Sequence, residues 1–256
     1  MSTFSLDPSS LDPSFGHDGL AASEPTPPPA PEGLAAYVDE LLKHPSRARA
    51  AIEGHPDLAR RARADVQVLV ACTAAFGASL GFYRGGVQIL FAAIKLPLVA
   101  LLTLAVAAPL LHALNRALQR PASMARDVSV LVAALARGAL VLAAELPLLW
   151  AAHALGADYH RLVLLTVLTC AIAGVVSFAF LWSALSTTKT GRGLVALFVL
   201  ATMGVVGAHG SWLFRPFLVR PRATHVVFMH PLEGSFSDSI EDSLSSAQGH
   251  YRESLR

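Results

Sequence analysis

The feature that most constrains this 256-residue chain is a series of apolar segments, each about as long as a membrane is thick. A helix needs about 20 predominantly apolar residues to cross a hydrocarbon core of about 30 Å. Lipid offers the backbone no hydrogen-bond partners, so such a segment must satisfy its own peptide groups as a helix. Four segments contain no charged residue: residues 66–83, 96–115, 162–185 and 194–214. The sequence therefore predicts an all-α membrane protein.

A fifth apolar segment, residues 128–157, is longer and contains Arg137 and Glu145. If the membrane-spanning part is residues 138–157, Arg137 lies at the interface, where its long side chain can reach the head groups. Glu145 is then the one carboxylate well inside the membrane. We expect this frame, and with it a five-helix transmembrane domain over residues 65–217.

The composition argues against an ordinary soluble enzyme. Hydrophobic residues make up 54% of the chain and charged residues only 15%, against about 25% charged residues in soluble domains. The 20 Lys+Arg nearly balance the 18 Asp+Glu, which is unlike a protein that neutralises nucleic-acid phosphates. The sequence contains no C-x-x-C pair, and its one G-x-S-x-G spacing, from Gly77 to Gly81, lies inside an apolar segment of membrane-spanning length. We therefore expect no enzyme activity, no cofactor and no nucleic-acid partner.

The segments outside the membrane differ from one another. Residues 1–33 are rich in Pro and Ser and predict a disordered tail. Residues 34–64 show helical apolar spacing and many arginines, which predicts amphipathic, basic helices lying against anionic lipid head groups. Residues 218–256 form a second tail.

The orientation follows from the basic residues near the ends of the spans. Eleven Lys and Arg lie on the side of residues 34–64, and six lie on the other side. Positively charged loops resist translocation. We expect a multi-pass protein of a bacterial inner membrane, with a cytoplasmic N-terminus and an external C-terminus.

Glu145 is the strongest candidate for chemistry, because an ionisable group in hydrocarbon costs about 3 kcal/mol on insertion scales. It predicts either a protonatable site facing the bundle interior or a carboxyl group satisfied locally, at a helix break caused by Pro147. The sequence leaves these alternatives open.

Lys95 is the second candidate. Gly85 and Gly86 predict a turn, and residues 89–94 then predict a half-helix dipping into the interface, with Lys95 reaching external head groups. One long kinked helix containing Pro97 is the alternative.

Two other patterns have simpler interpretations. Gly77 and Gly81 have the small-xxx-small spacing of close helix contacts, and packing within the chain is favoured over a dimer. Several histidines, including His153 and His160, lie near predicted external loops. Because they lack a metal-binding spacing such as H-E-x-x-H, we favour solvated side chains over a metal site.

Several short motifs in this sequence resemble those of a known protein family. Residues 81–88 (GFYRGGVQ), Lys95-Leu-Pro97 and the box from Trp212 to Phe217 occur in the same order in an uncharacterised family of bacterial multi-pass membrane proteins, common in cyanobacteria and sometimes titled actin-binding. The chain resembles this family over about two-thirds of its length. The resemblance implies an integral membrane protein with no established activity. The five-span plan also resembles the Yip-type trafficking proteins in architecture.

The Trp212 box is interpreted as a membrane anchor, with Trp212 at the interface and Pro216 ending the helix. Binding of a partner or lipid head group there is the alternative. The full set of candidate functional or anchoring residues is Glu145, Arg137, Lys95, Gln88, Asn115, Trp212, Arg215, Pro216 and Phe217.

Three function classes remain. The favoured one is a non-enzymatic membrane scaffold or assembly factor, with a protein partner or a second copy of the chain. A transporter or channel component using Glu145 is the alternative. An intramembrane enzyme acting on lipids comes third, because only Glu145 could serve its chemistry at membrane depth.

Overall fold

The computed structural model describes residues 33–54, 58–120, 123–157, 159–185 and 191–214. The predicted tails, residues 1–33 and 218–256, lie outside this range except for Gly33. Three candidate residues lie outside it too: Arg215, Pro216 and Phe217. Trp212 belongs to the last helix, but its side chain is not described.

The described residues form eight helices, and no strand is found among them. They are α1 (Leu34–Lys43), α2 (Pro45–Gly54), α3 (Leu58–Phe82), α4 (Val87–Ala117), α5 (Met124–Ala144), α6 (Leu146–Ala154), α7 (Tyr159–Ala184) and α8 (Arg192–Leu213). Five helical stretches are long and apolar enough to cross a membrane: α3, α4, α5 with α6, α7 and α8. The predicted all-α bundle of five spans is confirmed, and the chain is a multi-pass membrane protein.

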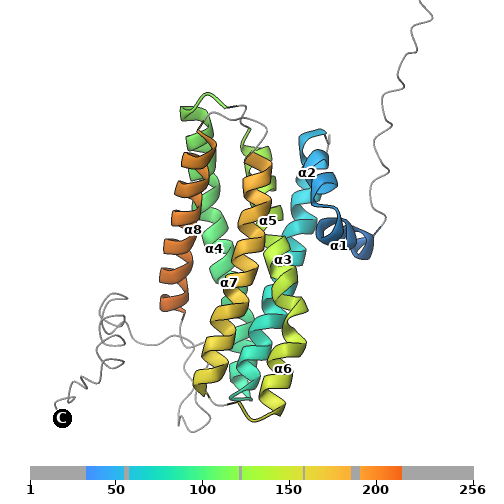
Figure 1. The fold of residues 1–256 in the computed structure, drawn as a ribbon, viewed down its shortest axis with the longest axis vertical. Helices are drawn as coiled ribbons and strands as arrows, with labels where there is room; N and C mark the ends of the chain where they lie inside the picture. The colour runs from blue at the N-terminus through green and yellow to red at the C-terminus, as the bar shows by residue number, and fades with distance from the viewer. Residues whose placement is uncertain (1–32, 55–57, 121–122, 158, 186–190, 215–256) are drawn as a thin grey trace, which may run out of the picture.

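The spans run side by side as one elongated bundle, with α1 and α2 packed against one end (Figure 1). We call this the head end. Helix α5 lies at the centre and contacts α1, α2, α3, α4, α6 and α7. Helix α8 packs mainly on α4 and only slightly on α7. The bundle is therefore tight around α5 and loose between α7 and α8.

Two glycines set the distance between α3 and α4. A Cβ atom at Gly77 would lie 2.3 Å from the carbonyl oxygen of Ala92, and one at Gly81 would lie 2.5 Å from that of Gln88. No other residue fits at these positions unless the helices move apart. The Gly77–Gly81 spacing thus serves packing within the chain, as expected.

Helix α4 is continuous from Val87 to Ala117, with Pro97 and Pro109 inside it. Of the two alternatives for this region, the long helix is the correct one, and the half-helix is wrong. The turn before it is confirmed, since Gly85 and Gly86 have φ of 77° and 62°. The close contacts with α3 cover the start of α4, so the helix remains regular through Lys95.

The third span begins at Met124, well before the expected frame of residues 138–157, and extends to Ala154. It is interrupted at Glu145, which ends α5 and precedes α6. Pro147 stands in the first turn of α6, where its missing N–H is tolerated. The break expected from Pro147 is therefore present.

Helices α1 and α2 bury their apolar face against the protein. Tyr37, Leu41, Ala48 and Ile52 belong to the same core as residues of α3, α4 and α5. The sequence predicts that this face lies on the membrane surface, but the core residues cover it, so that prediction is wrong for the apolar face. Exposed arginines such as Arg47 and Arg63 remain on the outer side.

Candidate functional site

The head end contains two clusters of polar side chains, one joining α1 to α3 and the other joining α4 to α5. The Tyr37 hydroxyl donates a hydrogen bond to Asp65 Oδ1. Arg61 Nη2 lies 2.6 Å from Glu40 Oε1, and its guanidinium lies 5.3 Å from the centre of the Tyr37 ring. These contacts fix α1 to the start of α3.

Burial and the neighbouring Asp65 raise the pKa of Tyr37 well above its ordinary value. Burial comes first because it disfavours the charged phenolate, and the carboxylate adds repulsion and accepts the hydroxyl proton. Tyr37 therefore stays a neutral hydrogen-bond donor at every physiological pH.

The second cluster surrounds Asp127 on α5. His112 Nδ1 lies 2.8 Å from Asp127 Oδ2, and Asn115 Nδ2 donates to Asp127 Oδ1 at 3.0 Å. Asp127 and Asn115 are both almost completely buried. The candidate Asn115 thus links the end of α4 to the start of α5.

Two arginines bind carbonyl groups at the end of α7. Arg49 Nη1 donates to Ser183 O at 3.1 Å, and Arg120 Nη2 donates to Leu185 O at 2.8 Å. Free carbonyls and the negative end of the helix dipole attract cations there. Arg126 adds an ion pair with Glu53, so α2 is joined to both α5 and α7.

Lys95 and Gln88 are fully buried on α4. The prediction that Lys95 reaches external head groups is therefore wrong. The packing of α3 over this part of α4 through Gly77 and Gly81 encloses it instead. Both side chains lie far from the Asp127 cluster along α4, so the structure does not bring the candidates of this helix into one site.

Arg137 and Glu145 lie along the third span, deeper than the two polar clusters. The Arg137 guanidinium lies 5.9 Å from the centre of the Phe180 ring on α7, and its Nε is buried without a hydrogen-bond partner. Glu145 Oε2 is likewise buried without a partner, and the side chain makes no capping bond to α6. One oxygen of the Glu145 carboxyl is therefore unsatisfied at the helix break.

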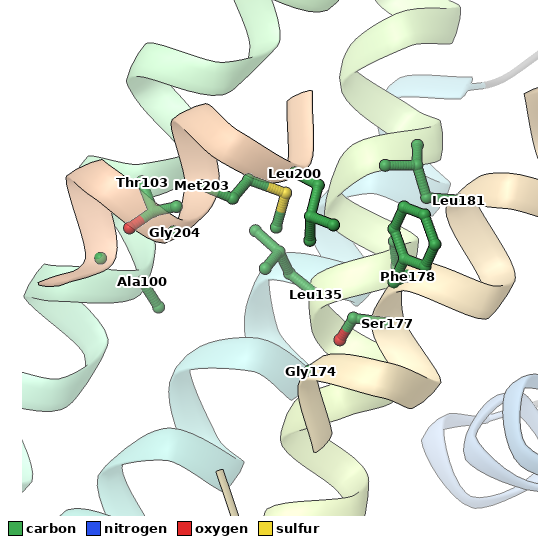
Figure 2. A pocket seen from close by; sticks show the side chains of 12 residues that line it. Ala100, Thr103, Leu135, Gly174, Ser177, Phe178, Leu181, Leu200, Met203 and Gly204 are labelled. Carbon is green, nitrogen blue, oxygen red and sulfur yellow. The ribbon is translucent and has the colours of Figure 1, made fainter. Parts of the chain in front are cut away.

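An apolar cavity of about 310 Å³ lies between α4, α5, α7 and α8. Figure 2 shows Leu200 and Met203 of α8 facing Leu135 of α5 and Phe178 of α7 across it. The hydroxyl groups of Thr103 and Ser177 border the cavity, but each already donates to a carbonyl in its own helix. None of the candidate residues lines this cavity.

Within the described ranges, no three His, Cys, Asp or Glu side chains come close enough to hold a metal ion. No protein-family model matches the chain, and no curated protein or solved structure is significantly similar to it. The resemblance to the cyanobacterial family therefore stays a prediction.

Sequence reasoning missed Tyr37 and Asp65 as one cluster, and His112 and Asp127 as parts of another. One feature of the sequence could have indicated these clusters, namely an acidic residue next to arginines at the start of a span. Asp65 follows the arginines of residues 60–63, and Asp127 follows Arg126. Acidic residues among basic ones at a membrane boundary predict ion pairing, but not which helices they join.

Proposed function

We propose that the protein is a non-enzymatic scaffold or organising factor of a bacterial inner membrane. The observation that carries this proposal is the fixed attachment of α1 and α2 to the membrane bundle through Arg61, Arg49 and Arg126. A pair of helices held this firmly presents a constant surface next to the membrane. The same proposal places the N-terminus in the cytoplasm and the C-terminus outside.

The buried polar groups support this role. Tyr37, Asp65, Asn115 and Asp127 bond to other helices, so their polar atoms already hold the bundle together. The cavity of about 310 Å³ is bordered by no titratable side chain. These features suit a rigid support better than a site of proton transfer or bond cleavage.

The partners in this proposal are the lipid bilayer, anionic head groups near the exposed Arg47 and Arg63, and either another membrane protein or a second copy of the chain. Nucleic acid is not a partner in this proposal. Membership of the uncharacterised bacterial family is also part of the proposal and rests on its motifs alone.

The test is purification of the full chain from native membranes in a mild detergent, with quantitative mass spectrometry of what co-elutes. Arg61→Ala should release α1 from α3 and reduce the amount of a stoichiometric partner. Arg63→Ala removes an exposed arginine two residues away and should leave that amount unchanged. If both variants retain the partner equally, or no partner occurs in a fixed ratio, the scaffold proposal is rejected.

Glu145 favours a second candidate, a transporter or channel component, because its Oε2 is buried in the membrane region without a partner. The discriminating experiment places a cysteine at this position (Glu145→Cys) in a chain whose Cys72 and Cys170 are replaced by alanine. Labelling by a small, polar, membrane-impermeant thiol reagent would indicate a water path to Glu145. Absence of labelling, with labelling retained at a cysteine placed at Arg63, would reject it.

A further inference from the structure

The gap between α7 and α8 contains the apolar cavity of about 310 Å³. Both helices pack on other partners, α7 on α5 and α8 on α4, and the cavity lies where they separate. Its lining residues Gly174, Leu200 and Gly204 are exposed. The cavity therefore opens sideways towards the surroundings of the bundle.

The position of the cavity along the spans places it at hydrocarbon depth. Gly174 lies near the middle of α7, and Gly204 lies near the middle of α8. The surrounding surface of α7 and α8 is apolar, with exposed Val175 and Leu197. A lateral opening at this depth faces lipid chains rather than water.

On the head-end side of the cavity, the same two helices place a tryptophan and an arginine in contact, Trp182 on α7 and Arg192 on α8. Phe178 lines the cavity, and the centre of its ring lies 6.0 Å from that of Trp182, one turn further along α7. The guanidinium of Arg192, at the start of α8, lies 4.2 Å from the centre of the Trp182 ring. Arg192 forms no ion pair with a carboxylate among the residues that the structure describes.

This arrangement matches the shape and charge of one lipid class. Arg192 lies eight residues before Leu200, which is about 12 Å along a helix. Trp and Arg are typical of the membrane interface, and a cation there attracts anionic head groups. An anionic head at Arg192 would leave its acyl chain at the level of the cavity.

We propose that the cavity between α7 and α8 is a binding site for one anionic phospholipid, whose acyl chain occupies the cavity and whose head group binds Arg192 beside Trp182. The lipid would fill the space that α7 and α8 leave between them. It would also join these two helices, which otherwise contact each other little. The site is independent of the scaffold proposal, because it uses neither α1 nor α2.

The chain offers a matched set of variants. Gly204 lines the cavity, and a Cβ atom there would meet nothing within 4 Å, so Gly204→Leu adds a side chain to the cavity wall without a clash at its Cβ atom. Gly174→Leu does the same from α7. Ala201→Leu places the same side chain on an exposed position of α8 that does not line the cavity. Arg192→Ala removes the cation, and Arg63→Ala removes an exposed arginine elsewhere.

The experiment uses the full chain in lipid nanodiscs that contain a trace of phosphatidylglycerol or phosphatidylcholine, each with a photoreactive diazirine in the acyl chain. Cross-links are mapped by mass spectrometry of peptides from α7 and α8. We expect phosphatidylglycerol to label the cavity-lining residues about fivefold more than phosphatidylcholine, the ratio for about 1 kcal/mol from one arginine near a membrane surface. Arg192→Ala should remove this difference, and Arg63→Ala should preserve it.

Either Gly204→Leu or Gly174→Leu should lower labelling of the cavity severalfold with both lipids, while Ala201→Leu leaves it unchanged. Size-exclusion profiles and thermal midpoints identify any variant that has not folded, and the other filling variant then decides. Equal labelling by the two lipids would overturn the proposal by showing only the ordinary lipid annulus. Cross-links between α7 and α8 of different copies would overturn it by showing that a second chain occupies the gap.

Discussion

The head end and the middle of the bundle differ in what their buried polar side chains contact. At the head end, Arg61 pairs with Glu40, and Asp127 accepts from both His112 and Asn115. Buried atoms without a hydrogen-bond partner occur in both regions: Asp65 Oδ2 and Asn115 Oδ1 at the head end, and Arg137 Nε and Glu145 Oε2 halfway along the third span. The two head-end side chains also bond to another helix through their other polar atom. In the first region, polar atoms hold helices together. In the second, small and apolar side chains do so, and the polar atoms are tolerated.

The comparison explains where rigidity comes from. Buried polar groups stabilise a structure only when they are paired, and an unpaired one costs about 1–3 kcal/mol. The head end gains orientation from its polar contacts, because together they join α1 to α3, α4 to α5, and α2 to both α5 and α7. The middle depends on close backbone contact, as between Gly77 and Ala92.

The largest effect is expected from disturbing the close contact between α3 and α4 at Gly77. Gly77→Ala places a Cβ atom 2.3 Å from the carbonyl oxygen of Ala92, so α3 and α4 must move apart. We expect the free energy of unfolding to fall by about 3 kcal/mol or more, because both atoms belong to the rigid backbone. Thermal unfolding in detergent measures the loss.

Gly174→Ala is the matched control, since its Cβ would meet nothing within 4 Å. It should change the thermal midpoint little. Similar midpoints for the two variants would show that α3 and α4 are not in tight contact at Gly77.

The next effect concerns the ion pair between α1 and α3. Arg61→Ala leaves Glu40 without its partner in a partly buried position. Breaking such a pair should lower stability by about 2 kcal/mol, less than for a fully buried pair, because Glu40 keeps some contact with water. Limited proteolysis should then cut between α2 and α3 sooner than in Arg63→Ala. Equal cleavage rates would mean that the pair does not hold the head in place.

A third, smaller effect depends on pH. The folded chain raises the pKa of Tyr37, so below the ordinary tyrosine pKa of about 10 the residue is protonated in both the folded and unfolded states. Above that pH only the unfolded state releases the proton, and stability should fall by about 1.4 kcal/mol per pH unit. Tyr37→Phe should remove this part of the alkaline loss. An unchanged slope in Tyr37→Phe would contradict a buried, neutral Tyr37.

The smallest effect is expected in the middle of the bundle. Glu145→Gln keeps the size of the side chain, and the Oε2 atom that it changes has no partner to lose. We expect a change in stability within about 0.5 kcal/mol, as for substitutions that disturb no specific contact. A loss as large as that of Arg61→Ala would show that Glu145 has a partner, and the contrast between the two regions would disappear.

Much of the fold could be predicted from the sequence, because membrane spans depend on local composition. The five spans and the role of Gly77 and Gly81 follow from the lengths of apolar segments and the spacing of small residues. The break at Glu145 follows from Pro147, which lacks the N–H that a helix interior needs. These features involve neighbouring residues only.

The candidate sites could be predicted less well, because they depend on which helices meet. Lys95 looks like an interfacial residue until α3 is placed over it. Asp127 resembles a solvated boundary residue until His112 and Asn115 are brought beside it, and their sequence positions carry no sign of this meeting. Likewise, the apolar face of α1 suits a membrane surface as well as it suits a protein core, and burial cannot be read from its periodicity.

The packing of α8 on α4 has a consequence for how the chain assembles during synthesis. Spans enter the membrane in the order in which the ribosome makes them, and they associate afterwards. The central helices α3, α4 and α5 follow one another directly, so their contacts can form early. Of the five spans, α8 is the last to be made, and it reaches α4 only after two other spans have been inserted. A four-span precursor, complete except for the side of α4 that carries Val99 and Thr103, would therefore precede the finished protein.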